Sequence, residues 1–97
     1  MTTKQRAFLK GLAMKTEPIF QIGKSSVTPE LPAAVDEALE ARELIKLSIL
    51  KNCLDDGASI AQVLAERTHA EVVQVIGKKI VLYRQAKDEK KRKITLP

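Results

Sequence analysis

The sequence has too few cysteines for its fold to be stabilised by disulfide bonds or by a cysteine-bound metal ion. Among its 97 residues Cys53 is the only cysteine, so the chain has no intramolecular disulfide and no zinc site built from several cysteines. No stretch approaches the roughly 18 apolar residues of a membrane span, and the start carries no apolar signal-peptide core. We therefore expect a soluble cytoplasmic protein of one domain, with no membrane partner.

Aromatic side chains are also scarce, and the chain has no tryptophan. Only Phe8, Phe20 and Tyr83 are aromatic. We expect Phe8 and Phe20 to pack inside, which leaves little surface on which nucleic-acid bases could stack. This disfavours recognition of stacked single-stranded bases.

Charge, in contrast, is abundant and unevenly distributed. The net charge is +5. Residues 1–28 hold five basic side chains against one acidic, residues 29–71 four against nine, and residues 72–97 eight against two. If the two ends of the chain meet in space, the fold presents one positive face, as a phosphate-binding protein does.

Apolar periodicity predicts three helices and four strands. The expected elements are a helix over 2–16, a strand over 18–22, a helix from 28 to about 42, a strand over 44–51, a helix that follows a cap at 55–57 and ends near 68, and strands over 71–76 and 80–84. Thr2 and Gln5 fit a capping box, and Thr28-Pro29 is a strong helix start. Gly77-Lys78-Lys79 reads as a hairpin loop.

This order predicts an α/β (α+β) fold with a mixed four-stranded sheet. Strands that alternate with helices favour parallel crossovers, and the hairpin makes the last strand antiparallel to its predecessor. Polar residues at alternate strand positions indicate one less buried sheet face, and hence two main layers; they are Gln21, Lys46, Ser48 and Gln74. We expect a domain over 1–86 and a basic tail over 87–97, which is a helix extension or mobile.

The loop Gly23-Lys24-Ser25-Ser26 is the main candidate for ligand binding. Glycine lets a backbone approach a phosphate closely, lysine adds a charge, and serine hydroxyls can donate to phosphate oxygens. The following helix start would add unpaired amides. The alternative is an ordinary strand-to-helix turn, and the spacing is not that of a nucleotide P-loop.

Further basic side chains could widen this site into a surface that follows an RNA backbone. They are Arg6, Lys10, Lys78, Lys79 and Arg84, with the basic tail beyond them. Each phosphate that they neutralise would release counterions and add affinity.

No residue pattern indicates catalysis, a metal or another cofactor. His69 lies at a helix-to-strand junction, where a capping or surface role is expected, and Cys53 reads as a small hydrophobe. Asp55-Asp56 is better explained as a helix cap than as a metal pair. We predict a monomer that is not an enzyme. An alternative function is a protein-interaction module that uses an acidic patch on the second helix (Asp36, Glu37, Glu40).

Several separated segments resemble one known family, the CRM domain (chloroplast RNA splicing and ribosome maturation), whose bacterial stand-alone form is called YhbY-like. The matching segments are Lys4-Gln5-Arg6, Phe8-Leu9-Lys10-Gly11-Leu12-Ala13, Pro18-Ile19-Phe20-Gln21-Ile22-Gly23-Lys24, Glu43-Leu44-Ile45-Lys46 and Gly77-Lys78-Lys79-Ile80-Val81-Leu82-Tyr83-Arg84. They cover about residues 3–85 in order.

The resemblance implies a fold similar to the C-terminal domain of translation initiation factor three. It also implies a ribosome-assembly role, with precursor ribosomal RNA of the large subunit as the partner. Ribosomal proteins are the partners expected under the alternative in which the acidic second helix binds protein. The family's GxxG loop, expected to contact RNA backbone, falls on Gly23, Lys24, Ser25 and Ser26. Ser26 replaces the second glycine, so a positive φ there would be strained.

Overall fold

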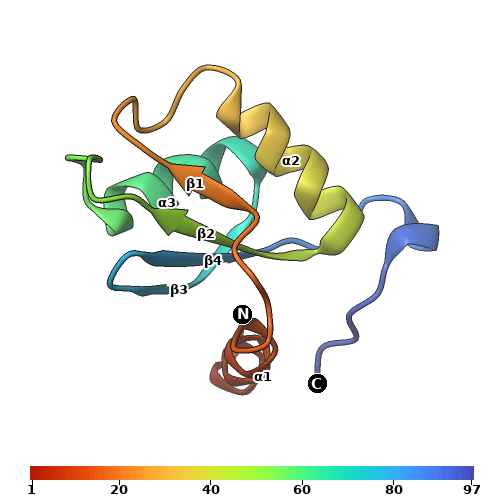
Figure 1. The fold of residues 1–97 in the computed structure, drawn as a ribbon. Coiled ribbons are helices and arrows are strands. Elements are labelled where there is room, and N and C mark those ends of the chain that lie inside the picture. Colours follow the sequence, from red (N-terminus) through yellow and green to blue (C-terminus); the bar gives the residue numbers. More distant parts are fainter.

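The computed structural model describes residues 1–97 and confirms the predicted order of elements (Figure 1). In chain order the elements are α1 Thr3–Ala13, β1 Phe20–Ile22, α2 Leu31–Arg42, β2 Leu44–Ile49, α3 Gly57–Thr68, β3 Glu71–Ile76, β4 Lys79–Tyr83 and the short 3-10 helix η1 Glu89–Lys91. None of the helices combines the length and the apolar character needed to cross a membrane.

The four strands form one mixed sheet in the order β1-β2-β4-β3. β1 pairs with β2 in parallel, while β4 lies antiparallel between β2 and β3. Three strands therefore run in one direction, so the loops that follow β1, β2 and β3 emerge at the same end of the sheet. The predicted mixed sheet is confirmed.

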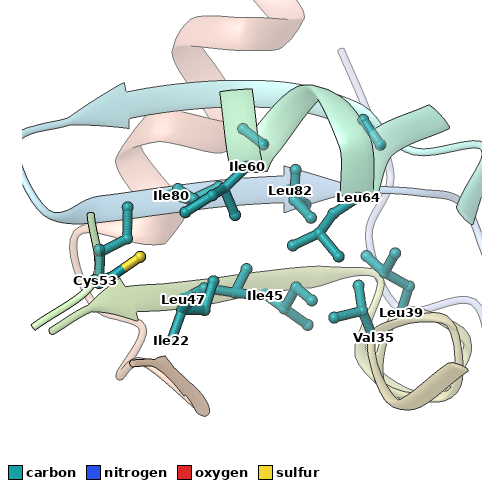
Figure 2. Packing of buried hydrophobic residues seen from close by; sticks show 13 residues of the cluster. Ile22, Val35, Leu39, Ile45, Leu47, Cys53, Ile60, Leu64, Ile80 and Leu82 are labelled. Atoms are coloured by element: carbon teal, nitrogen blue, oxygen red, sulfur yellow. The ribbon is translucent and has the colours of Figure 1, made fainter. Parts of the chain in front are cut away.

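One face of the sheet is covered by α2 and α3, which enclose the main hydrophobic core (Figure 2). Ile45, Leu47 and Leu82 point from the strands into this core, where they meet Leu39 and Leu64. Cys53 belongs to the same cluster, which confirms the prediction that it acts as a small hydrophobic residue. This face and its two helices are the two layers expected from the sequence.

The opposite face is covered only in part, by α1, which adds to the two predicted layers (Figure 1). Leu9 and Ala13 pack on Tyr83 and neighbouring strand residues, and Ile94 and Leu96 of the tail lie against the same cluster. Because α1 contacts the sheet mainly through Leu9 and Ala13, Phe8 remains 40% exposed. The prediction that Phe8 is buried is wrong. The two ends of the chain thus meet, as shown also by a hydrogen bond from Gln5 to the Pro97 carbonyl.

Local signals set most element boundaries. Thr2 and Gln5 form the predicted capping box, and Asp56 caps α3 by accepting from the Ser59 N–H. The hairpin turn is shorter than predicted, because Lys79 already pairs with Ile76 and leaves two turn residues.

The predicted start of α2, with Thr28 as the cap and Pro29 as the first helical residue, is wrong by two residues. The Leu31 N–H donates to the Thr28 carbonyl in a separate turn, and the helix begins at Leu31 with no side-chain cap. A helix beginning at Pro29 would place Pro32 at its fourth position, where an N–H is needed for the first helical hydrogen bond. Starting at Leu31 places Pro32 in the first turn, where its missing N–H costs nothing.

Candidate nucleic-acid interface

Three loops meet at the end of the sheet where β1, β2 and β3 finish, toward the left of Figure 1. The Leu50 N–H donates to the Ile22 carbonyl, which joins the exits of β1 and β2. The Ile49 N–H donates to the Lys78 carbonyl, which joins the exit of β2 to the hairpin turn. We call this surface the loop end, defined by residues 23–26, 50–56 and 77–79.

The Gly23–Ser26 loop is a tight turn in which the Ser26 N–H donates to the Gly23 carbonyl over 2.9 Å. Ser26 has a φ of 52°, so it adopts the left-handed backbone that glycine would adopt without strain. The loop therefore keeps a glycine-like shape despite the serine. Lys24 and Ser25 are exposed at its tip.

The same loop does not lead straight into a helix. Residues 27–30 separate Ser26 from the first residue of α2. The predicted contribution of helix-start amides to a phosphate site beside the serines is therefore wrong. The backbone turn and Lys24 are what this loop can offer to a ligand.

Exposed lysines gather at the loop end. Lys24, Lys78 and Lys79 were predicted from the sequence, and Lys51 in the loop after β2 was missed. None of them has a carboxylate within 4.0 Å, because the two ion pairs of the molecule are both made by Arg84. The parallel pairing of β1 and β2 places the loops that carry Lys24 and Lys51 at the same end of the sheet.

Lys10 lies on α1, across a groove from Lys79. Arg6, one turn earlier, is half-buried, and its guanidinium donates to the carbonyls of Val72 and Val73. These carbonyls belong to a bulge in the edge strand β3. Lys10 thus extends the basic surface, whereas Arg6 fixes α1 to the sheet.

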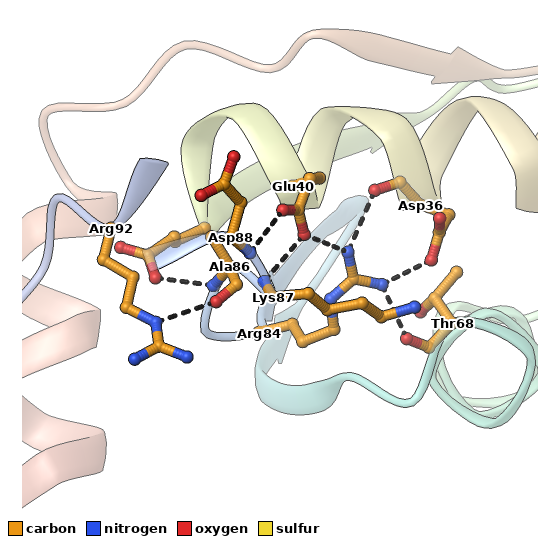
Figure 3. A network of polar contacts seen from close by, with 9 residues as sticks. Asp36, Glu40, Thr68, Arg84, Ala86, Lys87, Asp88 and Arg92 are labelled. Carbon is orange, nitrogen blue, oxygen red and sulfur yellow. Dashed lines mark hydrogen bonds and ion pairs between the residues drawn. The ribbon is translucent and has the colours of Figure 1, made fainter. Parts of the chain in front are cut away.

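The structure removes Arg84 from the predicted surface, because its side chain is only 8% exposed (Figure 3). The guanidinium is paired with Asp36 and Glu40 of α2 and donates to the Thr68 carbonyl over 2.9 Å. Arg84 follows Ile80 and Leu82 at alternate positions, so it faces α2 and α3 rather than solvent. Its charge joins the end of β4 to both helices.

The C-terminal tail is held by two carboxylates of the α2 end. Glu43 is fully buried and accepts from the backbone N–H groups of Ala86, Lys93 and Ile94. Glu40 accepts from the N–H groups of Lys87 and Asp88. The tail is therefore one 3-10 turn followed by a segment without regular secondary structure that folds back on the domain, rather than a continuous helix.

These contacts shift the titration of both carboxylates. Burial alone would raise the pKa of Glu43, but three backbone donors and nearby Arg92 outweigh it, so the pKa falls below its usual 4.5. The backbone N–H groups of Asp88 and Lys87 lower the pKa of Glu40, assisted by Arg84. Both carboxylates thus stay charged above about pH 4.5.

We expect acidification to release the tail. A lowered pKa in the folded state contributes stability above the unfolded pKa, and this stability is lost as pH falls through the folded pKa. Amide NMR spectra recorded from pH 7 to pH 3 should show the Lys93 and Ile94 signals moving to unstructured positions below about pH 4.5. Glu43→Gln should give those positions already at pH 7, and Glu37→Gln, which removes an exposed carboxylate of α2, should not. Tail signals unaffected by both acid and Glu43→Gln would contradict this assignment.

The acidic patch proposed for protein binding is largely used inside the molecule. Asp36 and Glu40 pair with Arg84, and only Glu37 of the three has no hydrogen bond. Two of the three carboxylates are thus engaged within the molecule, while Glu37 and part of Asp36 remain exposed.

The structure also shows the positions of His69 and of the residue types that could bind a metal ion. His69 is exposed and ends α3 in a left-handed conformation, which fits the predicted capping role. No group of three or more His, Cys, Asp or Glu side chains lies close enough to hold a metal ion.

These features define the class of protein: a small α+β domain with a candidate polyanion-binding surface at one end of a mixed sheet. The family model of the CRS1 / YhbY (CRM) domain matches residues 1–84. The chain belongs to this CRM domain family.

Similar proteins are named for RNA binding. The chain is 44% identical to the probable RNA-binding protein YqeI of Bacillus subtilis, across 100% of this chain and 99% of that protein. An RNA-binding protein of Haemophilus influenzae is 34% identical, across 93% of this chain and 91% of that protein. A solution structure of a Staphylococcus aureus protein, described as a candidate for RNA binding, superposes with a TM-score of 0.78 at 44% identity, across 100% of this chain and 99% of that one.

Proposed function

We propose that this protein binds structured precursor ribosomal RNA of the large subunit in the cytoplasm, as an assembly factor that does no covalent chemistry. The observation that carries the proposal is the loop end, where Lys24, Lys51 and Lys78 are exposed without carboxylate partners. Relatives named as RNA-binding proteins support RNA as the polyanion.

The mechanism that fits this surface is backbone docking. The left-handed Ser26 shapes a turn whose backbone can lie close to a phosphodiester, and lysines on two further loops provide charge around it. Lysine ammonium groups recognise phosphates without reading the base sequence, so shape and charge density of a folded RNA would select the site. The bound protein would hold an RNA folding intermediate until assembly proceeds.

Sedimentation of cell lysate at low salt tests the assembly role. We expect the protein to travel with precursors of the large ribosomal subunit and to leave them as salt is raised, because counterion release drives backbone binding. Crosslinking to RNA would then identify the contacted segment. Absence from every ribosomal precursor fraction at low salt would contradict the assembly role, while RNA binding in a purified system would still stand.

A further inference from the structure

A groove of about 580 Å³ lies between α1 and the open half of the sheet face that α1 covers. Lys46, Val81 and Gln74 form one row of its floor, across β2, β4 and β3. Leu9 and Ala13 pack against the sheet beside Tyr83 and Leu44. The groove lies on the other side of α1, toward the hairpin and Lys79. It is therefore continuous with the loop end through Lys79.

Gly11 lines this groove on the α1 side and has no side chain that would occupy it. A Cβ added at this position would meet nothing within 4 Å, and the residue has no positive φ. Neither packing nor backbone conformation thus requires glycine here, although glycine inside a helix costs roughly 1 kcal/mol relative to alanine. The glycine lowers helix stability and leaves the groove open.

The groove is complementary to a ligand that is negatively charged at one edge and apolar over its body. Lys10, Lys46 and Lys79 line it, and no carboxylate does. The Lys46 ammonium donates to the Ala13 carbonyl and that of Lys79 to the Ser48 hydroxyl, which leaves each ammonium with further donors.

Apolar side chains at the groove are unusually open to solvent. Met14 is 84% exposed and Ile76 61% exposed. Gln74 adds an amide that can both donate and accept at the edge of a base. No aromatic side chain lines the groove, so it does not fit a run of stacked bases.

We propose that the groove binds one unpaired nucleotide of the RNA held at the loop end. Its base lies on Met14, Ile76 and Val81, and its phosphates face Lys10 and Lys79. This inference rests on the proposed function and adds a preference to it: a helical RNA with a bulged nucleotide is bound better than the same helix without one.

Two hairpin RNAs that differ by a single bulged adenosine test this preference. The unaltered protein should bind the bulged hairpin about tenfold tighter, because the bulged base gains contacts in the groove that the plain helix cannot make. Gly11→Leu fills the groove, so it should abolish the preference, leave affinity for the plain hairpin unchanged and not lower the melting temperature. Gly11→Ala, which is too small to fill the groove, should keep the preference.

Equal binding of both hairpins by the unaltered protein would overturn the inference, as would a preference that survives Gly11→Leu. A dimer without RNA that Gly11→Leu converts to monomer would assign the groove to a second copy instead. Micromolar binding of free adenosine monophosphate that Gly11→Leu removes, together with equal binding of the two hairpins, would assign the groove to a small ligand and overturn the inference. Failure to bind either hairpin would contradict the proposed function itself.

Discussion

Arg84→Ala should lower the free energy of unfolding by about 3 kcal/mol, the largest effect expected of any single substitution here. Removal of the guanidinium leaves the Asp36 carboxylate and the Thr68 carbonyl without their donor, and it takes one of three donors from Glu40. The cost is placed at the low end of the range for a broken buried ion pair, because the Asp36 side chain is 46% exposed and can be hydrated. Urea unfolding followed by circular dichroism measures it.

Two further variants make this result specific. Arg84→Lys should recover only part of the loss, because a single ammonium cannot reach both carboxylates and the carbonyl together. Arg67→Ala, at an exposed position of α3, should change stability by less than about 0.5 kcal/mol. If Arg84→Ala left stability unchanged and weakened RNA binding, Arg84 would be the surface contact that the sequence suggested.

The second large effect concerns RNA affinity. Replacing Lys24, Lys51 and Lys78 together by alanine should weaken binding of a structured RNA about 100-fold at about 0.1 M salt, because each lost phosphate contact forfeits its counterion release. All three side chains are exposed and free of carboxylates, so the protein should keep its stability within about 1 kcal/mol. Fluorescence anisotropy with a labelled RNA hairpin gives the affinities.

Much of the fold could be predicted because its signals are local. The capping box at Thr2, the cap at Asp56 and the period-two pattern of β2 each depend on neighbours a few residues apart. Glycine in the hairpin turn, with a φ of 55° at Gly77, is a signal of the same kind. The resemblance of separated segments to the CRM domain added the loop as a candidate site.

What could not be predicted depends on contacts between distant residues. Glu43 has no local sign of burial, since the N–H groups that satisfy its carboxylate come 43 to 51 residues later. Arg84 did carry a signal, because it continues the buried alternation of Ile80 and Leu82 while Asp36 and Glu40 lie one turn apart on α2. The prediction assigned Arg84 to the surface only because arginine is charged. In the structure, pairing with two carboxylates allows this charged side chain to be buried.

For the candidate site, the sequence supplied the residue types and the fold supplies their arrangement. Lys46 could be recognised from alternation as lying on the wetter sheet face, but only the position of α1 places it in a groove with Lys10 and Lys79. Ser26 could be recognised as a departure from the family loop, and only the backbone shows that it adopts positive φ.

The salt dependence of RNA binding tests the central claim, that exposed lysines at the loop end hold the RNA backbone. The logarithm of affinity should fall linearly with the logarithm of salt concentration, and the slope should shrink by about 3 in the Lys24, Lys51 and Lys78 alanine variant. The matched control removes three exposed tail lysines at the opposite end of the sheet, Lys87, Lys90 and Lys91, and should change the slope by less than about 1. An unchanged slope in the loop-end variant, or an equal loss in the tail control, would contradict the claim.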